Sequence, residues 1–299
     1  MANFPLQSNL FSDDVKLEPI RAGFGRGLKL AGERDDRVVP LCADLTESTQ
    51  MHIFRDAFPK RFVQIGIAEQ NLVTVASGMA RMGKIPFVSS YAAFSPGRNW
   101  EQIKTTAALN DQPVKIIGSH AGVSVGPDGA THQMLEDIAL MRVMPNMIVI
   151  APGDSIEAEK ATLAIAGNGK PSYMRLAREK TPVFSTEDSP FEIGKAYVLR
   201  EGSDVTIVTT GTMILASSRK TGRVVTAEEA QKAGGLGGAV AELLSEKLPT
   251  PLMRIGINDR YGESGAPMEL MEHFGLDGDS VARTVSDFIQ NTSQYHREY

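Results

Sequence analysis

Short apolar segments alternate along the chain with longer segments in which apolar residues recur every three or four positions. Between residues 20 and 180 the short segments predict strands at Arg37–Cys42, Phe62–Ile65, Ile85–Ser89, Pro113–Gly118, Met147–Ile150 and Tyr173–Leu176. The longer segments predict helices at Ala68–Met82, Trp100–Leu109, Met134–Met144 and Ile156–Ala166, the last with Ser155 as its N-cap and Gly167–Gly169 at its end. This alternation is typical of a parallel sheet covered by helices on both faces.

A second α/β pattern follows the segment Ala177–Ile193, which is rich in Pro, Ser and Thr and is expected to be a linker. It predicts strands and helices at Asp204–Thr210, Arg223–Thr226, Leu236–Leu248, Leu252–Ile257, Pro267–Phe274 and Ser280–Gln290. The predicted fold class is therefore α/β, with two doubly wound parallel-sheet domains. We expect an N-terminal extension over residues 1–19, a first domain over 20–180, a linker over 181–193 and a smaller second domain over 194–299.

The composition and charge of the chain limit the kinds of partner that we expect it to bind. The chain has 299 residues, 42% of them hydrophobic, which suits one large or two medium domains with cores of their own. Acids and bases nearly balance, to a net charge of −5, and form no basic stripe, so we expect no nucleic acid as a partner. No apolar run approaches the length of a membrane span, so we expect no membrane as a partner either. The first residues lack the basic and apolar regions of a signal peptide, and Cys42 is the only cysteine. A reducing, cytoplasmic setting is the expected location.

Glycine and polar residues crowd the ends of the predicted strands in the first domain, where ligands of open α/β sheets bind. Three segments have this character: ADLTEST, GIAEQN and SHAGVSVGPDGATHQ, which contains His120 and His132. Each candidate also has a structural interpretation. Glu69 could complement a helix dipole, the two histidines could be satisfied loop residues, and the glycines could simply form turns. The sequence has no spacing typical of a metal site, so the pattern alone indicates an α/β enzyme or enzyme subunit.

Several segments, in order, resemble the pyrimidine-binding and C-terminal domains of transketolase. They are CADLTEST, FVQIGIAEQN, PFVSSYAAFSPGRNWEQI, GSHAGVSVGPDGATHQMLEDIALMR and MRLAREKTPV, within a match that extends from about Ile20 to Ile289. The resemblance implies a thiamine-diphosphate-dependent transferase that moves a two-carbon ketol unit between sugar phosphates. The sugar pair stays open between pentose phosphates and more specialised sugars.

The resemblance also implies roles for individual residues. Glu69 matches the carboxylate that activates the cofactor aminopyrimidine, and the matching cofactor-binding set is Glu69, Tyr91, Phe94 and Arg98. Glu69, His120 and His132 match catalytic positions. The matching substrate-binding residues form two groups. Asp128 and His132 match the pair that recognises donor hydroxyls, and the residues that match the phosphate-binding set are Arg21, Ser48, His120 and Arg178.

The sequence departs from the family in two respects. It contains no counterpart of the N-terminal domain that binds the diphosphate and its Mg²⁺ or Ca²⁺, so we expect a second subunit to supply that domain in an α₂β₂ heterotetramer with β–β contacts. The second domain is shortened near residues 217–220, where about one βα unit is missing by comparison with a typical length of ~30 residues for βαβ.

Three alternatives remain open at this point. Deoxyxylulose-phosphate synthases share the GIAEQ and DGxTHQ segments, but they usually lack a histidine at the position of His120 and the ADLT-x-S segment. The β subunits of 2-oxo acid dehydrogenases are separate chains, but they lack DGATHQ. The chain could also be a non-catalytic assembly subunit, which ketol transfer by the chain with its partner would exclude.

Overall fold

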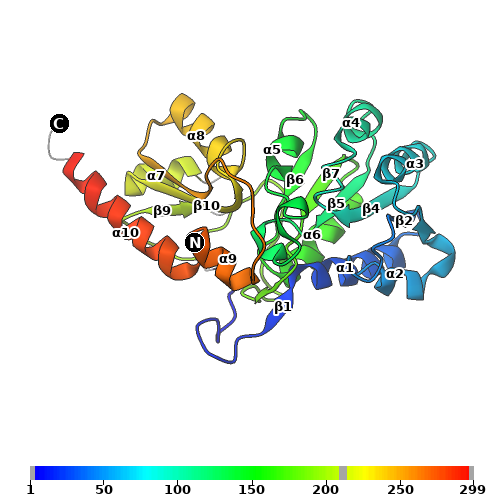
Figure 1. Ribbon diagram of the computed structural model, residues 1–299, viewed down its shortest axis with the longest axis horizontal. Coiled ribbons are helices and arrows are strands. Elements are labelled where there is room, and N and C mark those ends of the chain that lie inside the picture. The colour runs from blue at the N-terminus through cyan, green and yellow to red at the C-terminus, as the bar shows by residue number, and fades with distance from the viewer. Residues whose placement is uncertain (1–3, 209–213, 296–299) are drawn as a thin grey trace.

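The computed structural model describes residues 4–208 and 214–295, which form two α/β domains side by side (Figure 1). The strands of the first domain are β1 (Leu17–Pro19), β2 (Val38–Cys42), β3 (Val63–Gln64), β4 (Ile85–Tyr91), β5 (Lys115–Ser119), β6 (Ile148–Ile150), β7 (Ser172–Arg175) and β8 (Lys180–Pro182). Its helices are α1 (Ile20–Arg34), α2 (His52–Ala57), α3 (Glu69–Arg81), α4 (Trp100–Gln102), α5 (Asp137–Arg142) and α6 (Ser155–Gly167).

Six strands of the first domain form one parallel sheet in the order β3-β2-β4-β5-β7-β6. Both faces of this sheet are covered, which explains why its strands are continuous apolar segments. Leu41, Val88 and Ile116 belong to the core under α3, whereas their neighbours Cys42, Phe87 and Ile117 belong to the core under α1 and α6. The predicted doubly wound parallel sheet is confirmed.

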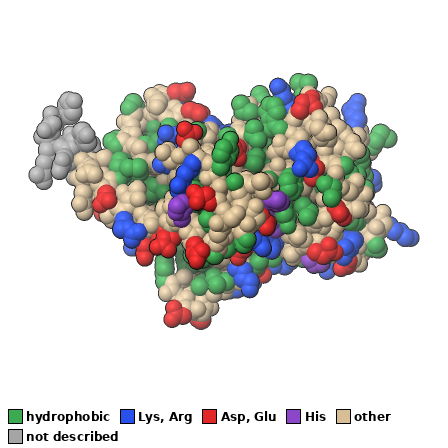
Figure 2. Space-filling model, viewed as in Figure 1, with side chains coloured by type: hydrophobic (Ala, Val, Ile, Leu, Met, Phe, Trp, Pro, Cys, Tyr) green, Lys and Arg blue, Asp and Glu red, His purple; other side chains and the backbone are tan. Residues whose placement is uncertain are grey.

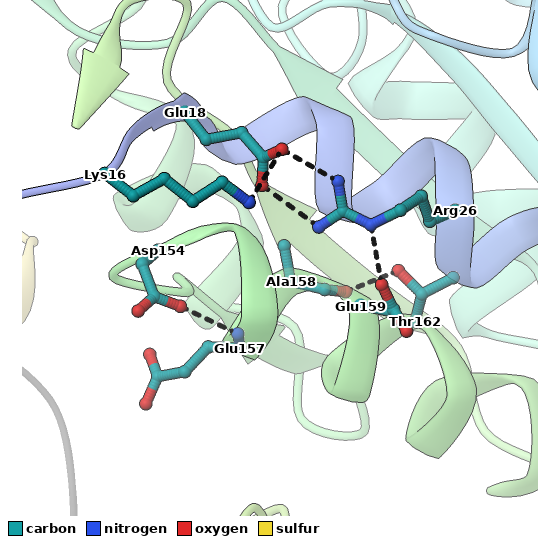
Figure 3. A network of polar contacts seen from close by, with 8 residues as sticks. All are labelled: Lys16, Glu18, Arg26, Asp154, Glu157, Ala158, Glu159 and Thr162. Carbon is teal, nitrogen blue, oxygen red and sulfur yellow. Dashed lines mark hydrogen bonds and ion pairs between the residues drawn. The ribbon is translucent and has the colours of Figure 1, made fainter. Parts of the chain in front are cut away.

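Helices α1 and α6 pack closely because glycines line their contact. A Cβ on Gly23 would overlap the carbonyl oxygen of Ser155, and a Cβ on Gly27 would lie 2.8 Å from the carbonyl oxygen of Glu159. Beside this contact Arg26 donates to Glu18 at 3.1 Å and to Glu159 at 2.8 Å, so one guanidinium joins both helices and β1 (Figure 3). No helix was predicted for Ile20–Arg34, and four of its residues are glycines, which have low helix propensity.

The segment after β7 folds back onto the first domain. Strand β8 pairs antiparallel with β1 of the N-terminal segment. The buried Asp154 carboxylate accepts hydrogen bonds from the backbone N–H groups of Phe184 and Ser185, at 2.9 and 2.7 Å. It also accepts from Glu157 N at 2.8 Å, so Asp154 is the N-cap of α6, and the prediction of Ser155 as N-cap was wrong by one residue.

Two predicted helices differ from the observed ones. The predicted helix Met134–Met144 is helical only over α5. Met134 instead forms an isolated β-bridge with Ala121, in which its carbonyl oxygen accepts from Gly122 N at 2.9 Å. The predicted helix Trp100–Leu109 consists of the single turn α4 followed by a π-helical segment, Ile103–Ala108.

The second domain has a three-stranded parallel sheet in the order β11-β10-β9. Its strands are β9 (Thr206–Val208), β10 (Val224–Gln231) and β11 (Leu252–Ile257), and its helices are α7 (Ile214–Thr221), α8 (Leu236–Lys247), α9 (Pro267–His273) and α10 (Gly278–Tyr295). Val224 packs with Val240 and Leu244 of α8 on one face, and Ile255 packs with Phe288 of α10 on the other. The prediction of a smaller second domain wound on both faces is confirmed.

The shortening near residues 217–220 falls in α7, which has eight residues and is the only described element between β9 and β10. The predicted strand Asp204–Thr210 is observed over Thr206–Val208, and its last two positions lie outside the described residues.

The face drawn in Figure 2 carries basic and acidic side chains of both domains interspersed with one another. No helix among the described residues is both long and apolar enough to cross a membrane.

Gly23→Ala should lower the free energy of unfolding of the chain by about 1–3 kcal/mol, because the added methyl group has no space against α6. Gly78→Ala in α3 is the matched control, since a Cβ there meets nothing within 4 Å. That control should raise stability by about 0.5–1 kcal/mol, through helix propensity. Urea unfolding of both variants measures the difference, and equal effects would contradict the close contact of α1 with α6.

Candidate active site

Most of the predicted site residues lie at the carboxyl edge of the six-stranded sheet. Glu69 begins α3 just after β3, Tyr91 ends β4, and His120 follows β5. Because all six strands are parallel, these loops meet at one edge. The fold therefore brings together groups that are far apart in the sequence.

Glu69 is a buried carboxylate that pairs with one cation among the described residues. Its side chain is 2% exposed, and Oε2 accepts from Nη1 of Arg98 at 2.9 Å. Arg98 is 51% exposed and lies over the ring of Phe94, 4.8 Å from the centroid. Asn99 Nδ2 donates to the backbone carbonyl of Glu69 at 2.8 Å and fixes the start of α3. Asn99 was not among the predicted site residues, although it lies in the segment PFVSSYAAFSPGRNWEQI.

Aromatic and imidazole rings form a continuous wall beside this carboxylate. Tyr91 stacks on His120, with 3.9 Å between centroids. Phe94 meets the edge of His132 at 5.4 Å, and the centroids of Tyr91 and Phe94 are 6.2 Å apart. Four of the predicted residues are therefore in mutual contact, and Arg98 connects them to Glu69.

His120 is held in an unusual state. Its backbone has φ +57°, a left-handed conformation that is uncommon for a residue with a side chain. Its ring is buried, and Nδ1 lies 2.9 Å from the hydroxyl of Ser119. Burial, and then the positive charges of Arg21 and Arg178, lower its pKa to about 3. The ring is consequently neutral near pH 7, and one ring nitrogen donates while the other accepts.

Arg21 and Arg178 lie side by side next to His120. Arg21 Nη1 donates to the carbonyl oxygen of Arg178 at 2.6 Å, and Arg178 Nη1 donates to that of Val125 at 2.5 Å. Burial and the charge of Arg178 lower the pKa of Arg21. Within residues 4–208 and 214–295, the carboxylate paired with Arg178 is that of Glu179, at a long 3.7 Å. Two adjacent guanidinium groups with little compensating charge suit a doubly charged anion such as a phosphate.

Two of the predicted site residues, Ser48 and Asp128, lie outside this cluster. Ser48 is half-buried in the loop after β2, and Asp128 is exposed just before the turn Gly129–Thr131. Neither of their side chains makes a hydrogen bond or ion pair with any other residue in the ranges 4–208 and 214–295.

A cavity of about 510 Å³ lies at the opposite edge of the sheet, lined by Arg34, Asp35, Lys84 and Pro113 among others. It is remote from the cluster described above, and α1, α3 and α6 all end there, so their dipoles disfavour an anionic ligand. The carboxyl edge is therefore the better candidate for binding an anionic ligand. Among the described residues, no group of three or more His, Cys, Asp or Glu side chains is arranged to hold a metal ion.

Fold and site together define a class: a two-domain parallel α/β protein with a buried carboxylate and an aromatic wall at the strand ends. A family model described as the transketolase pyrimidine binding domain matches residues 19–183, and one described as the transketolase C-terminal domain matches residues 212–281. The chain belongs to the transketolase family.

Several relatives match this chain over nearly their whole length and nearly the whole length of this chain. A protein named for a transketolase C-terminal section, from Methanocaldococcus jannaschii, is 40% identical over 90% of this chain and 95% of its own length. A 6-deoxy-6-sulfo-D-fructose transketolase subunit from Clostridium sp. is 37% identical over 93% and 97%. A solved structure described as a split gene transketolase, inactive beta4 tetramer, has 39% identity and a TM-score of 0.83, covering 91% of this chain and 98% of its own.

The low pKa of His120 predicts a pH dependence of stability. Unfolded histidine has a pKa near 6.5, so between about pH 6.5 and 3 the unfolded state binds a proton that the native state does not. Stability should fall in this window as the pH falls, by at most about 1.4 kcal/mol per pH unit. His120→Gln should remove this component. Urea unfolding at several pH values measures it, and the two proteins should give parallel curves above about pH 7.5. Parallel curves below pH 6 as well would contradict the prediction.

Proposed function

We propose that the chain is one subunit of a thiamine-diphosphate-dependent transketolase, which transfers a two-carbon ketol unit between sugar phosphates. The observation that carries this proposal is the buried carboxylate of Glu69 beside the Tyr91–Phe94 rings, in one continuous cluster with the Arg21–Arg178 pair. A carboxylate with aromatic walls suits a flat, polar heterocycle, and paired guanidinium groups suit the phosphate of a sugar.

The residues present fit the pyrimidine end of the cofactor. Glu69 would hydrogen-bond the aminopyrimidine ring, Tyr91 and Phe94 would line its faces, and Arg98 would hold the carboxylate in place. When bound, the cofactor supplies the carbon nucleophile and the electron sink for cleaving the bond next to a carbonyl group.

The other predicted residues, both those in the cluster and Ser48 and Asp128 outside it, act on the substrate. Arg21 and Arg178 bind the phosphate, with Ser48 as a further donor. His120 and His132, whose rings contact Tyr91 and Phe94, donate and accept hydrogen bonds at the substrate oxygens, and Asp128 contacts donor hydroxyls. A neutral His120 serves this purpose because it has one donor and one acceptor nitrogen.

The names of the relatives support dependence on a partner. One is a C-terminal section, another a subunit, and the related tetramer built from one chain type is described as inactive. We infer that an N-terminal-half subunit supplies the diphosphate and Mg²⁺ or Ca²⁺ site, in a cytoplasmic α₂β₂ heterotetramer with β–β contacts.

The purified chain alone, with thiamine diphosphate and Mg²⁺, should show no ketol transfer, whereas addition of the N-terminal-half subunit should give turnover. A coupled assay of ketol transfer between sugar phosphates measures both. Turnover by the chain alone would contradict the partner dependence, and inactivity of the correctly assembled complex would contradict the enzymatic role.

Glu69→Gln should lower the turnover number of the assembled enzyme by ~10²–10⁴-fold, because a neutral amide cannot replace the carboxylate at the aminopyrimidine ring. Glu101→Gln is the matched control, since Glu101 is an exposed carboxylate on nearby α4, and it should leave turnover unchanged. Activity of Glu69→Gln close to that of the wild type would exclude the assigned role.

Arg178→Ala should raise the KM for a phosphorylated acceptor about ten- to a hundredfold, the equivalent of one charge-assisted hydrogen bond. The KM for glycolaldehyde, an acceptor without phosphate, should change much less. Arg34→Ala removes an arginine at the opposite edge of the sheet and should change neither value. Equal losses for the two acceptors in Arg178→Ala would show that this arginine does not bind phosphate.

A further inference from the structure

The loop from His120 to Glu136, which carries His120, Asp128 and His132 and is called the substrate loop below, rests against the second domain. Two of its glycines, Gly122 and Gly129, lie directly against the second domain. Gly122 and Gly129 have φ of +93° and +70°, and a Cβ on Gly122 would overlap the carboxylate of Glu229, whereas one on Gly129 would overlap Ser264 Oγ. The spacing of these glycines therefore reflects the approach of the second domain as well as the turns of the loop.

A carboxylate from the second domain binds the backbone of the substrate loop. Glu229, near the end of β10, accepts a hydrogen bond from Ser124 N through Oε1 at 2.6 Å. The backbone of Glu229 is fixed in turn, because its carbonyl oxygen accepts from Arg175 Nη2 of β7 at 2.7 Å. Arg175 thus attaches the backbone of Glu229 to the first sheet, and it also donates to the carbonyl oxygen of Met134 in the substrate loop.

Further contacts brace the same loop. The buried Gln133 side chain donates to the carbonyl oxygens of Val123 and Gly126 within the loop, at 3.1 and 3.2 Å, and to that of Glu263 in the second domain at 2.8 Å. Val123 also packs in one apolar cluster with Leu270 of α9.

We propose that Glu229 is a positioning residue for donor recognition, holding the substrate loop in the conformation that presents His120 and His132 to the substrate. The inference rests on the proposed function, and it assigns the second domain a direct part in the active site. A carboxylate oxygen can accept from a backbone N–H whether or not the group is ionised, and burial raises the pKa of Glu229. The loop has flexible glycines on both sides of Ser124, so this hydrogen bond restrains a segment that would otherwise be mobile.

The first test compares two donors in the enzyme assembled with its N-terminal-half partner. Fructose 6-phosphate carries the hydroxyls that the loop would recognise, whereas hydroxypyruvate carries only the ketol unit. Glu229→Ala should lower kcat/KM for fructose 6-phosphate about tenfold more than for hydroxypyruvate. Glu229→Gln should restore most of the ratio, because its side-chain oxygen can accept from Ser124 N. A proportional loss for both donors, or no loss, would overturn the proposal.

Glu242→Ala is the control for general weakening of the domain contact. Glu242 pairs with Arg142 across the same two domains, at 2.6 Å, but does not touch the substrate loop. The ratio of the two kcat/KM values should not change in this variant. An equal change in Glu242→Ala and Glu229→Ala would assign the effect to domain docking instead of loop positioning.

Hydrogen–deuterium exchange of the full chain separates this inference from the proposed function, because it requires no turnover. Peptides covering residues 122–126 should exchange faster in Glu229→Ala than in the wild type and in Glu229→Gln, while peptides of α8 stay unchanged. Unchanged exchange of these peptides in Glu229→Ala would overturn the positioning role. An inactive wild-type complex with faster exchange in the variant would refute the proposed function and keep the positioning role.

Discussion

The guanidinium group of Arg175 joins the first sheet, the substrate loop and the second domain at one buried point. Its Nε donates to Asp137 Oδ2 at 3.0 Å, and its Nη2 donates to the carbonyl oxygens of Met134 and Glu229 at 3.3 and 2.7 Å. Tyr173 OH donates to the same carboxylate oxygen of Asp137 at 2.7 Å. Removal of either charge would leave the other buried without its ion-pair partner, which costs several kcal/mol. The relative positions of loop and domain depend on this ion pair.

At its carboxyl edge, the parallel sheet places groups of like charge close together. Arg21 and Arg178 repel each other, and both disfavour a charge on the buried ring of His120. The cluster is therefore electropositive and poorly compensated on the protein side, which a substrate dianion would relieve. At the other end of the ring wall, Arg98 neutralises Glu69, so the site combines an anion-binding end with a carboxylate end.

The fold was predictable where local pattern and tertiary environment agree. The strand Leu252–Ile257 was predicted at its observed bounds, and the helix Pro267–Phe274 to within one residue. Prediction failed where distant contacts overrode local preference. Helix α1 contains glycines that only its packing against α6 explains, and Met134 is held in a bridge to Ala121 instead of a helix. Helix propensity predicts neither the helix α1 nor the bridge at Met134, because both depend on contacts with residues more than ten positions away.

Residue types at fixed spacing along single segments were sufficient to determine the family, the two-domain α/β class and the loops that hold the candidate site residues. Only the tertiary structure decided that Glu69 is buried against Arg98, that His120 is neutral, and that Glu229 of the second domain reaches the substrate loop. All three features depend on which strand ends and loops lie next to one another in the folded chain. They are the burial of a side chain, the proximity of like charges and the contact between the domains. The order of residues in a single segment therefore cannot determine them.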